Sequence, residues 1–272
     1  SGTGGGIENL SVGNQKLSVA LVQDGDNTNS SGYIFDARLA NIGLWENASL
    51  ELAMAYNFAT EKDSKNEVAD DGVLVSAILH QGLSNGFNQT VFQYGTAGYG
   101  AQAANFWGAG SYYARGTEAF NDASGFRLLN WGVINLGENW EMGHQLAYLA
   151  GSDIGGQFGG DGANKNTYTG KSFDIDQYSV VVRPMYKWND TMRTVFEAGY
   201  NAGEKISNGG LATEDFGNAK FTVAQAWAMG DSFWARPELR VYGTYLLDTE
   251  NDKAFGDDDT EFVVGIQVEA WW

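Results

Sequence analysis

The sequence lacks several residue types on which common protein classes depend. Its 272 residues include no cysteine, two histidines and two prolines. The lack of cysteine excludes a disulfide framework, a thiolate zinc site and a cysteine nucleophile. Only 16 Lys and Arg stand against 34 Asp and Glu, and a net charge of −18 argues against nucleic-acid binding. No apolar run approaches the roughly 18 residues of a membrane-spanning helix, since the longest are short segments such as 73–79.

Glycine and aromatic residues are abundant instead, with 37 Gly, 9 Trp, 13 Tyr and 15 Phe. Together with the absence of helical runs, this composition predicts many strands joined by turns. The first six residues contain no Met and no basic or apolar stretch. A signal peptide is therefore expected to have been removed or to lie outside this sequence.

Almost every ordered segment alternates apolar and polar residues with a period of two. In 260–272, one face carries Phe262, Val264, Ile266 and Val268, and the other carries Glu261, Gln267 and Glu269. Two architectures fit this alternation: a soluble sandwich that buries its apolar face, and a membrane barrel that turns it towards lipid. In a barrel, the apolar set of 260–272 faces lipid and the polar set faces the lumen.

The connections between strands favour the barrel. We predict thirteen strands, near 5–12, 16–23, 32–43, 49–59, 73–83, 87–97, 125–136, 141–151, 176–188, 192–203, 219–230, 234–247 and 260–272. Short turns alternate with long polar loops between them, as in bacterial barrels, whereas a sandwich has no reason to sort its connections in this way. A simple closed antiparallel barrel needs an even number of strands, so thirteen means either that one strand has been missed or that this chain lacks the beginning of a longer barrel. We favour the second interpretation.

Two further features bear on the barrel. Aromatic side chains lie on the apolar face at the strand ends, like the interfacial girdles of barrels; they are Tyr33, Tyr56, Tyr94, Tyr186, Trp188, Tyr200, Tyr245 and Trp272. Pro184 and Pro237 fit less well, because each removes a ladder hydrogen bond and a closed barrel has no edge strand.

Five segments carry a family resemblance. They are GGGIEN at 4–9, GENW at 137–140, RPMYKW at 183–188, GDSFWARP at 230–237 and QVEAWW at 267–272. These segments resemble the maltoporin family of sugar-specific outer-membrane porins, and they keep their order over nearly the whole chain, whereas the loops match poorly. Members of that family form trimeric barrels of 18 strands, and this chain resembles strands 6 to 18.

The resemblance implies an all-β, antiparallel transmembrane barrel in which residues 1–272 form a single porin domain that is incomplete at its N-terminal end. Its implied function is passive, selective diffusion of maltose and malto-oligosaccharides across the outer membrane of a Gram-negative bacterium, without a cofactor or catalysis. Implied partners are outer-membrane lipid, two further copies in a homotrimer, and bacteriophages that bind the long outer loops. The alternatives are a porin for another sugar such as sucrose, a non-specific porin, and a soluble lectin-like β-sandwich.

The resemblance also implies a row of aromatic side chains in the lumen that guides the sugar, matched here by Phe87, Trp234 and Trp271. The residues themselves agree, because each of these aromatics shares the polar face of its predicted strand. A pyranose ring packs its C–H face on an aromatic ring while its hydroxyls reach charged neighbours. The alternative is that these rings only fill space inside the lumen.

Charged residues on the same face are candidate partners for sugar hydroxyls: Arg38, Arg183, Arg193, Arg236, Glu238 and Arg240. They can equally form a general ionic lining that pairs with itself. His80 and His144 lie on different predicted strands with no Ser or Asp at a telling spacing, so we expect no catalytic site. The segments 24–28 and 257–259 are acidic but lack the pattern of a calcium loop, so we expect no metal.

Overall fold

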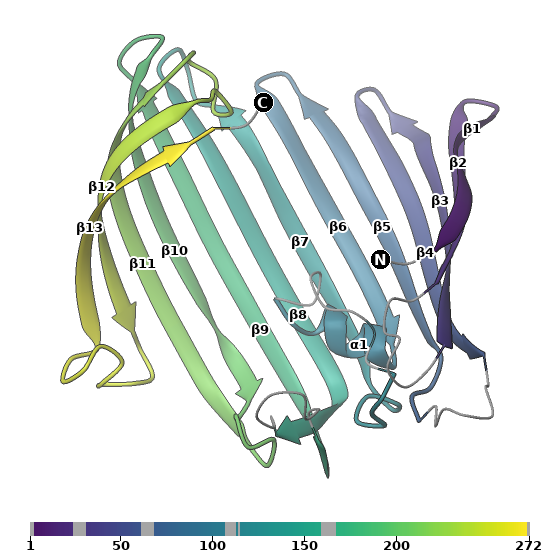
Figure 1. Cartoon of the computed structure of the whole chain (residues 1–272). Helices are drawn as coiled ribbons and strands as arrows, with labels where there is room; N and C mark the ends of the chain where they lie inside the picture. Colours follow the sequence, from purple (N-terminus) through teal and green to yellow (C-terminus); the bar gives the residue numbers. More distant parts are fainter. Residues whose placement is uncertain are drawn as a thin grey trace.

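The chain folds into one antiparallel sheet in which every strand pairs with its neighbours in sequence (Figure 1). The computed structural model describes residues 3–23, 31–60, 68–106, 113, 115–158 and 167–270. The strands are β1 (Gly4–Val12), β2 (Gln15–Gln23), β3 (Ser31–Trp45), β4 (Ala48–Thr60), β5 (Gly72–Leu83), β6 (Gly86–Thr96), β7 (Ser124–Asn135), β8 (Trp140–Phe158), β9 (Thr167–Lys187), β10 (Met192–Ile206), β11 (Thr213–Ala228), β12 (Glu238–Asp248) and β13 (Thr260–Glu269). One short helix, α1 (Gly98–Ala103), lies between β6 and β7.

The predicted count of thirteen strands is confirmed for the described residues, and three groups of boundaries are corrected. Strands β10 and β11 pair beyond the predicted 192–203 and 219–230, as far as Ile206 and Thr213, so most of the predicted loop 204–218 is a hairpin. Strands β8 and β9 pair well beyond the predicted 141–151 and 176–188, so part of the predicted long loop between them is a hairpin. The predicted strand 234–247 begins only at Glu238. Pro237 has no N–H to donate to a ladder, so pairing starts directly after it.

The sheet curves into a trough, with β1 and β13 at its two sides (Figure 1). Within the described residues, β1 pairs only with β2 and β13 only with β12. The described strands therefore form one open, curved antiparallel sheet. No helix among the described segments is long and apolar enough to cross a membrane.

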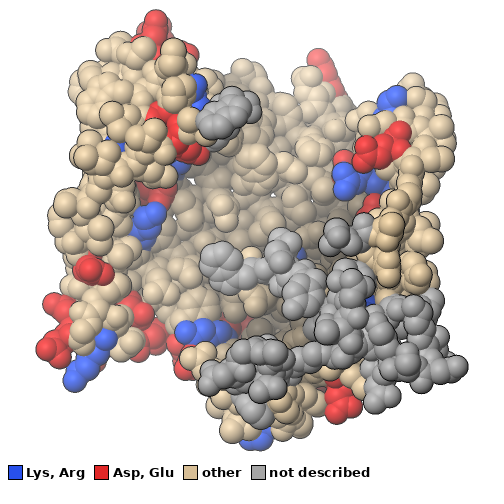
Figure 2. Space-filling model, viewed as in Figure 1, with Lys and Arg blue, Asp and Glu red and all other residues tan. Residues whose placement is uncertain are grey.

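The two faces of the trough have opposite chemistry. On the outer face of β13, Phe262, Val264, Ile266 and Val268 are 67–73% exposed. The inner face carries the buried polar side chains, which include Arg127, Glu141, Gln177, Arg193, Glu238 and Thr244. Figure 2 looks into the hollow and shows charges of both signs on its side walls. A soluble sheet hides its apolar face, so this arrangement is the one expected of a wall between lipid and water.

Aromatic side chains form two bands on the outer face. At the short-turn rim, the Trp140 and Tyr186 rings lie 5.1 Å apart; nearer the long-loop rim, Phe126 and Tyr148 lie 5.8 Å apart. Trp140 and Tyr148 are eight residues apart on β8. In a tilted strand that separation spans roughly 20 Å of membrane thickness, close to the apolar band of about 25 Å in outer-membrane barrels.

Two segments fold inward over the inner face, one from each rim. The first, called segment 97–123, is described at residues 97–106, 113 and 115–123; it contains α1 and lies near the long-loop rim (Figure 1). It packs on inward-facing glycines, since a Cβ on Gly95 would lie 2.5 Å from the Tyr99 carbonyl. Within it, Tyr113 donates a hydrogen bond to the Asp70 carbonyl, and burial raises the pKa of the Tyr113 phenol. The second segment, residues 230–237, precedes β12 at the short-turn rim.

Candidate functional site

A row of four aromatic rings lies on the inner face at the short-turn rim. The Phe87 and Trp131 ring centroids are 5.2 Å apart, and those of Trp131 and Trp234 are 6.5 Å apart, both in edge-to-face geometry. Phe233 continues the row, with its centroid 5.1 Å from that of Trp234. The row therefore joins β6, β7 and the inward segment 230–237 into one aromatic surface.

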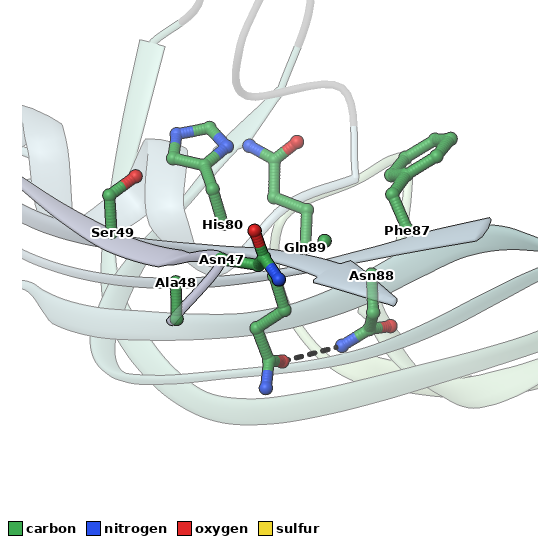
Figure 3. A pocket seen from close by; sticks show the side chains of 9 residues that line it. Asn47, Ala48, Ser49, His80, Phe87, Asn88 and Gln89 are labelled. Carbon is green, nitrogen blue, oxygen red and sulfur yellow. Dashed lines mark hydrogen bonds between the residues drawn. The ribbon is translucent and has the colours of Figure 1, made fainter. Parts of the chain in front are cut away.

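The register of β6 and β7 positions the first two rings. Phe87 pairs with Val133, and Gln89 pairs with Trp131, so both aromatics lie on the same face as diagonal neighbours. Figure 3 shows Phe87 and Gln89 on the same side of the sheet as His80, with Asn88 on the other. Phe87 follows the tight turn that begins β6, which places it close to the rim.

Phe233 anchors the inward segment in the wall. It packs against a buried cluster formed by Met185, Val195, Ala224 and Ala226. Its ring also lies over Gly143, where an added Cβ would approach the ring tip at 2.8 Å. Trp234, the next residue, is 47% exposed and faces the hollow. Segment 230–237 thus packs Phe233 against the wall and leaves Trp234 exposed to the hollow.

Arg193 on β10 also binds this segment from the inner face of the sheet. Its guanidinium donates hydrogen bonds to the carbonyls of Ser232 and Ala235, the residues on either side of Phe233 and Trp234. It also forms an ion pair of 3.0 Å with Glu238, and both side chains are 2% exposed. A hydrogen bond to a charged group contributes about 1.5–3 kcal/mol, so these contacts strongly favour the inward position of the segment.

The ionic network continues along the start of β12. Arg240 lies 2.7 Å from Glu238 and 2.8 Å from Glu269, and Arg236 lies 2.8 Å from Glu269. Arg183 also lies near this segment, with its guanidinium 5.5 Å from the centre of the Phe233 ring. Five of the six predicted charged residues therefore lie around segment 230–237; they are Arg183, Arg193, Arg236, Glu238 and Arg240. Arg38 does not join them, because it lies on β3, where it pairs with Glu51 at 3.4 Å.

The structure corrects and extends the predicted aromatic set. Phe87 lies on the inner face as expected, whereas Trp234 lies on a folded-in segment and does not begin a strand. Trp271 lies outside the described residues. Trp131 and Phe233 are absent from the prediction. Trp131 was detectable, because it shares the polar face of its strand with Arg127, which is the same signal that identified Phe87.

The two histidines lie on opposite faces of the sheet. His80 is on the inner face beside Gln89 (Figure 3). His144 is on the outer face, where its Nε2 lies 3.1 Å from the amide oxygens of both Asn88 and Asn130. Among the residues that the structure describes, no group of three or more His, Cys, Asp or Glu side chains could hold a metal ion.

A curved antiparallel wall with an apolar outside, aromatic bands at two levels and an ionic, aromatic inside defines a porin-type channel. The LamB porin family model matches residues 1–272. The chain therefore belongs to the LamB porin family, which comprises channels and not enzymes.

Three maltoporins are among the similar proteins. That of Vibrio parahaemolyticus is 64% identical, over 98% of this chain and 93% of its own length. That of Photobacterium profundum is 45% identical, over 100% of this chain and 60% of its own. That of Hahella chejuensis is 38% identical, over 100% of this chain and 62% of its own. The chain thus spans nearly the whole Vibrio protein and about three-fifths of the other two.

Proposed function

We propose that this chain forms most of the wall of an outer-membrane channel through which maltose and malto-oligosaccharides diffuse passively. The observation that carries the proposal is Trp234, an exposed aromatic side chain held on the inner face beside an ionic network. Large aromatic side chains on a wet polar surface need a ligand or a packing role. The name maltoporin, which three similar proteins carry, supports a maltose-type sugar as that ligand.

The chemistry of the inner face suits weak sugar binding. Phe87 and Trp234 offer flat apolar surfaces for pyranose rings, and we propose Trp271, which lies outside the described residues, as a third. The charged network around 230–237 offers donors and acceptors for hydroxyls. Each stacking contact contributes about 1 kcal/mol, so three contacts approach the roughly 4 kcal/mol of millimolar binding. A channel needs such weak binding, because a tightly bound sugar would not leave.

The open edges of the sheet support the proposal that 1–272 is one porin domain completed by further strands. Backbone groups of an unpaired strand cost several kcal/mol each in lipid, and β1 and β13 each have one unpaired edge in the part of the chain described. We extend the proposal to an outer-membrane location in a Gram-negative bacterium, assembly as a homotrimer, and bacteriophage binding at the long loops. The outer apolar face supports contact with lipid.

Ion-current block in planar bilayers tests the function. The intact channel should conduct ions, and its current should be blocked by maltotriose and maltohexaose at millimolar concentration or below, but much less by sucrose. A channel that sucrose blocks equally well would instead serve another sugar. Absence of block by any sugar, with liposome swelling that depends on solute size alone, would identify a non-specific porin.

A further inference from the structure

We propose that Trp131, together with Arg183 and Glu197, forms a further sugar-binding subsite that takes one pyranose ring of a passing oligosaccharide. The subsite lies on the inner face of β7, β9 and β10, beside segment 230–237. The proposal rests on the sugar-channel function above and adds a contact to it.

Trp131 lies between the two aromatic residues that the proposed sugar path already includes. Its ring lies between Phe87, at 5.2 Å, and Trp234, at 6.5 Å, so it closes the gap between those two aromatics. The interplanar angles are 84° and 86°, so neither neighbour stacks flat against it. A ring that only filled space would be enclosed by the wall, whereas Trp131 is partly exposed and borders a cavity.

The size of that cavity suits one sugar ring. Its volume is about 240 Å³, and it is bounded by Trp131, Gln145, Arg183, Glu197, Phe233 and Trp234. Pockets for drug-sized molecules are larger, at roughly 300–1,000 Å³. The cavity therefore fits a single ring, while the remaining units of an oligosaccharide extend along the row of aromatics.

Arg183 and Glu197 supply complementary polar groups in the same cavity. The Arg183 Nε and a Glu197 carboxylate oxygen are 3.9 Å apart, too far for a direct hydrogen bond. The Arg183 guanidinium lies 5.5 Å from the centre of the Phe233 ring, and Lys220 holds the other Glu197 oxygen at 2.8 Å. A donor and an acceptor in fixed positions match adjacent sugar hydroxyls, one accepting from Arg183 and the other donating to Glu197.

The test compares single variants of the intact channel by ion-current block with maltose, maltotriose and maltohexaose. Trp131→Ala should lower the affinity for maltohexaose about threefold to tenfold, and Trp131→Leu should do the same because it keeps apolar volume but lacks a flat face. Trp131→Phe should retain more affinity than either. Glu197→Gln should also weaken binding, because it replaces a charged acceptor. The matched control is Trp227→Ala, since Trp227 is an exposed tryptophan on the outer face of β11.

Unchanged affinity in Trp131→Leu, in a channel that Trp234→Ala does weaken, would overturn the subsite and leave the proposed function standing. Absence of sugar block in the unaltered channel would instead overturn the proposed function. If Trp131→Ala does not assemble, Trp131→Leu and Trp131→Phe decide the outcome, because both keep an apolar side chain of substantial volume at this position. Equal affinities of these two variants would show that the flat ring contributes nothing.

Discussion

The two inward segments approach the same lumen from opposite rims, yet different forces hold them. Segment 97–123 buries small and tyrosine side chains, including Ala97, Tyr99, Ala103, Ala104, Tyr113 and Ala123, against the inner wall. Segment 230–237 packs only the partly buried Phe233 against apolar neighbours, and it is otherwise held by the hydrogen bonds and ion pair of Arg193. The first segment covers the wall closely, while the second displays an exposed tryptophan.

This difference suggests a division of labour. Packing of small residues on glycines holds segment 97–123 close against the inner face near the long-loop rim, so we expect it to narrow the pore there. Directional hydrogen bonds from Arg193 fix segment 230–237 in the position that orients Trp234 towards the proposed sugar path. Changes in the first segment should therefore act on stability and ion flow, and changes in the second on sugar affinity.

The largest expected effect concerns the sheet that carries both segments. Residues 1–272 alone, reconstituted into planar bilayers, should show no sugar-blockable conductance, because the free edges of β1 and β13 cannot be left bare in lipid. The intact channel under the same conditions is the control. Clear block of the isolated chain by maltotriose would point to a smaller closed barrel, in which the two segments face each other directly.

The next largest effect is expected from removing the Arg193 contacts that hold segment 230–237. Arg193→Met removes the 3.0 Å ion pair with the buried Glu238, which keeps Arg240 at 2.7 Å, and it leaves the Ser232 and Ala235 carbonyls without their donor. The variant should therefore cost about 1.5–3 kcal/mol and weaken sugar block. Thermal unfolding in detergent and current-block titration measure the two effects.

Arg38→Met is the matched control for that variant, because Arg38 is half exposed and pairs with Glu51 away from the segment. It should change stability by about 0–1 kcal/mol and leave sugar affinity unaltered. Equal effects of the two variants would mean that Arg193 contributes only general charge to the lumen.

A pair of glycine variants tests the division of labour directly. Gly125→Ala places a Cβ against the backbone of Gly100 in segment 97–123, which cannot yield easily, so it should cost about 1–3 kcal/mol without changing sugar affinity. Gly143→Ala meets the tip of the Phe233 ring, which can shift, so its stability cost should be smaller. That shift moves Trp234, and sugar block should weaken. If Gly125→Ala weakened sugar block and Gly143→Ala affected only stability, the proposed difference between the two segments would be wrong.

The smallest expected effect is that of a single stacking surface. Trp234→Ala should lower affinity for maltohexaose about threefold to tenfold, which corresponds to about 1 kcal/mol, and Trp271→Ala should do likewise. Ion conductance should stay the same or rise slightly, because the lumen widens while the ionic network remains. Current-noise titration measures both quantities. If neither variant changes the affinity, these aromatics only fill space.

Much of the wall was predictable because it depends on local pattern. A period of two assigns each side chain to a face whatever the rest of the chain does, and on β13 the apolar residues lie outside as expected. The thirteen strands followed from the same alternation and from the turns between them. Arg236, Glu238 and Arg240 were found because they shared a face with Trp234 in the predicted strand, although that strand proved shorter.

What the sequence by itself determined is therefore the two-faced wall and the polarity of its inside. Only the tertiary structure decided that 230–237 folds inward. The residues at 234–237 continue the apolar–polar alternation of the following strand, so the local pattern cannot distinguish an inward-folded segment from a strand. The choice depends on partners far along the chain: Phe233 needs the space left by Gly143, and the carbonyls beside it need Arg193. Such contacts exist only once β8, β10 and β12 have come together, so no window of neighbouring residues contains them.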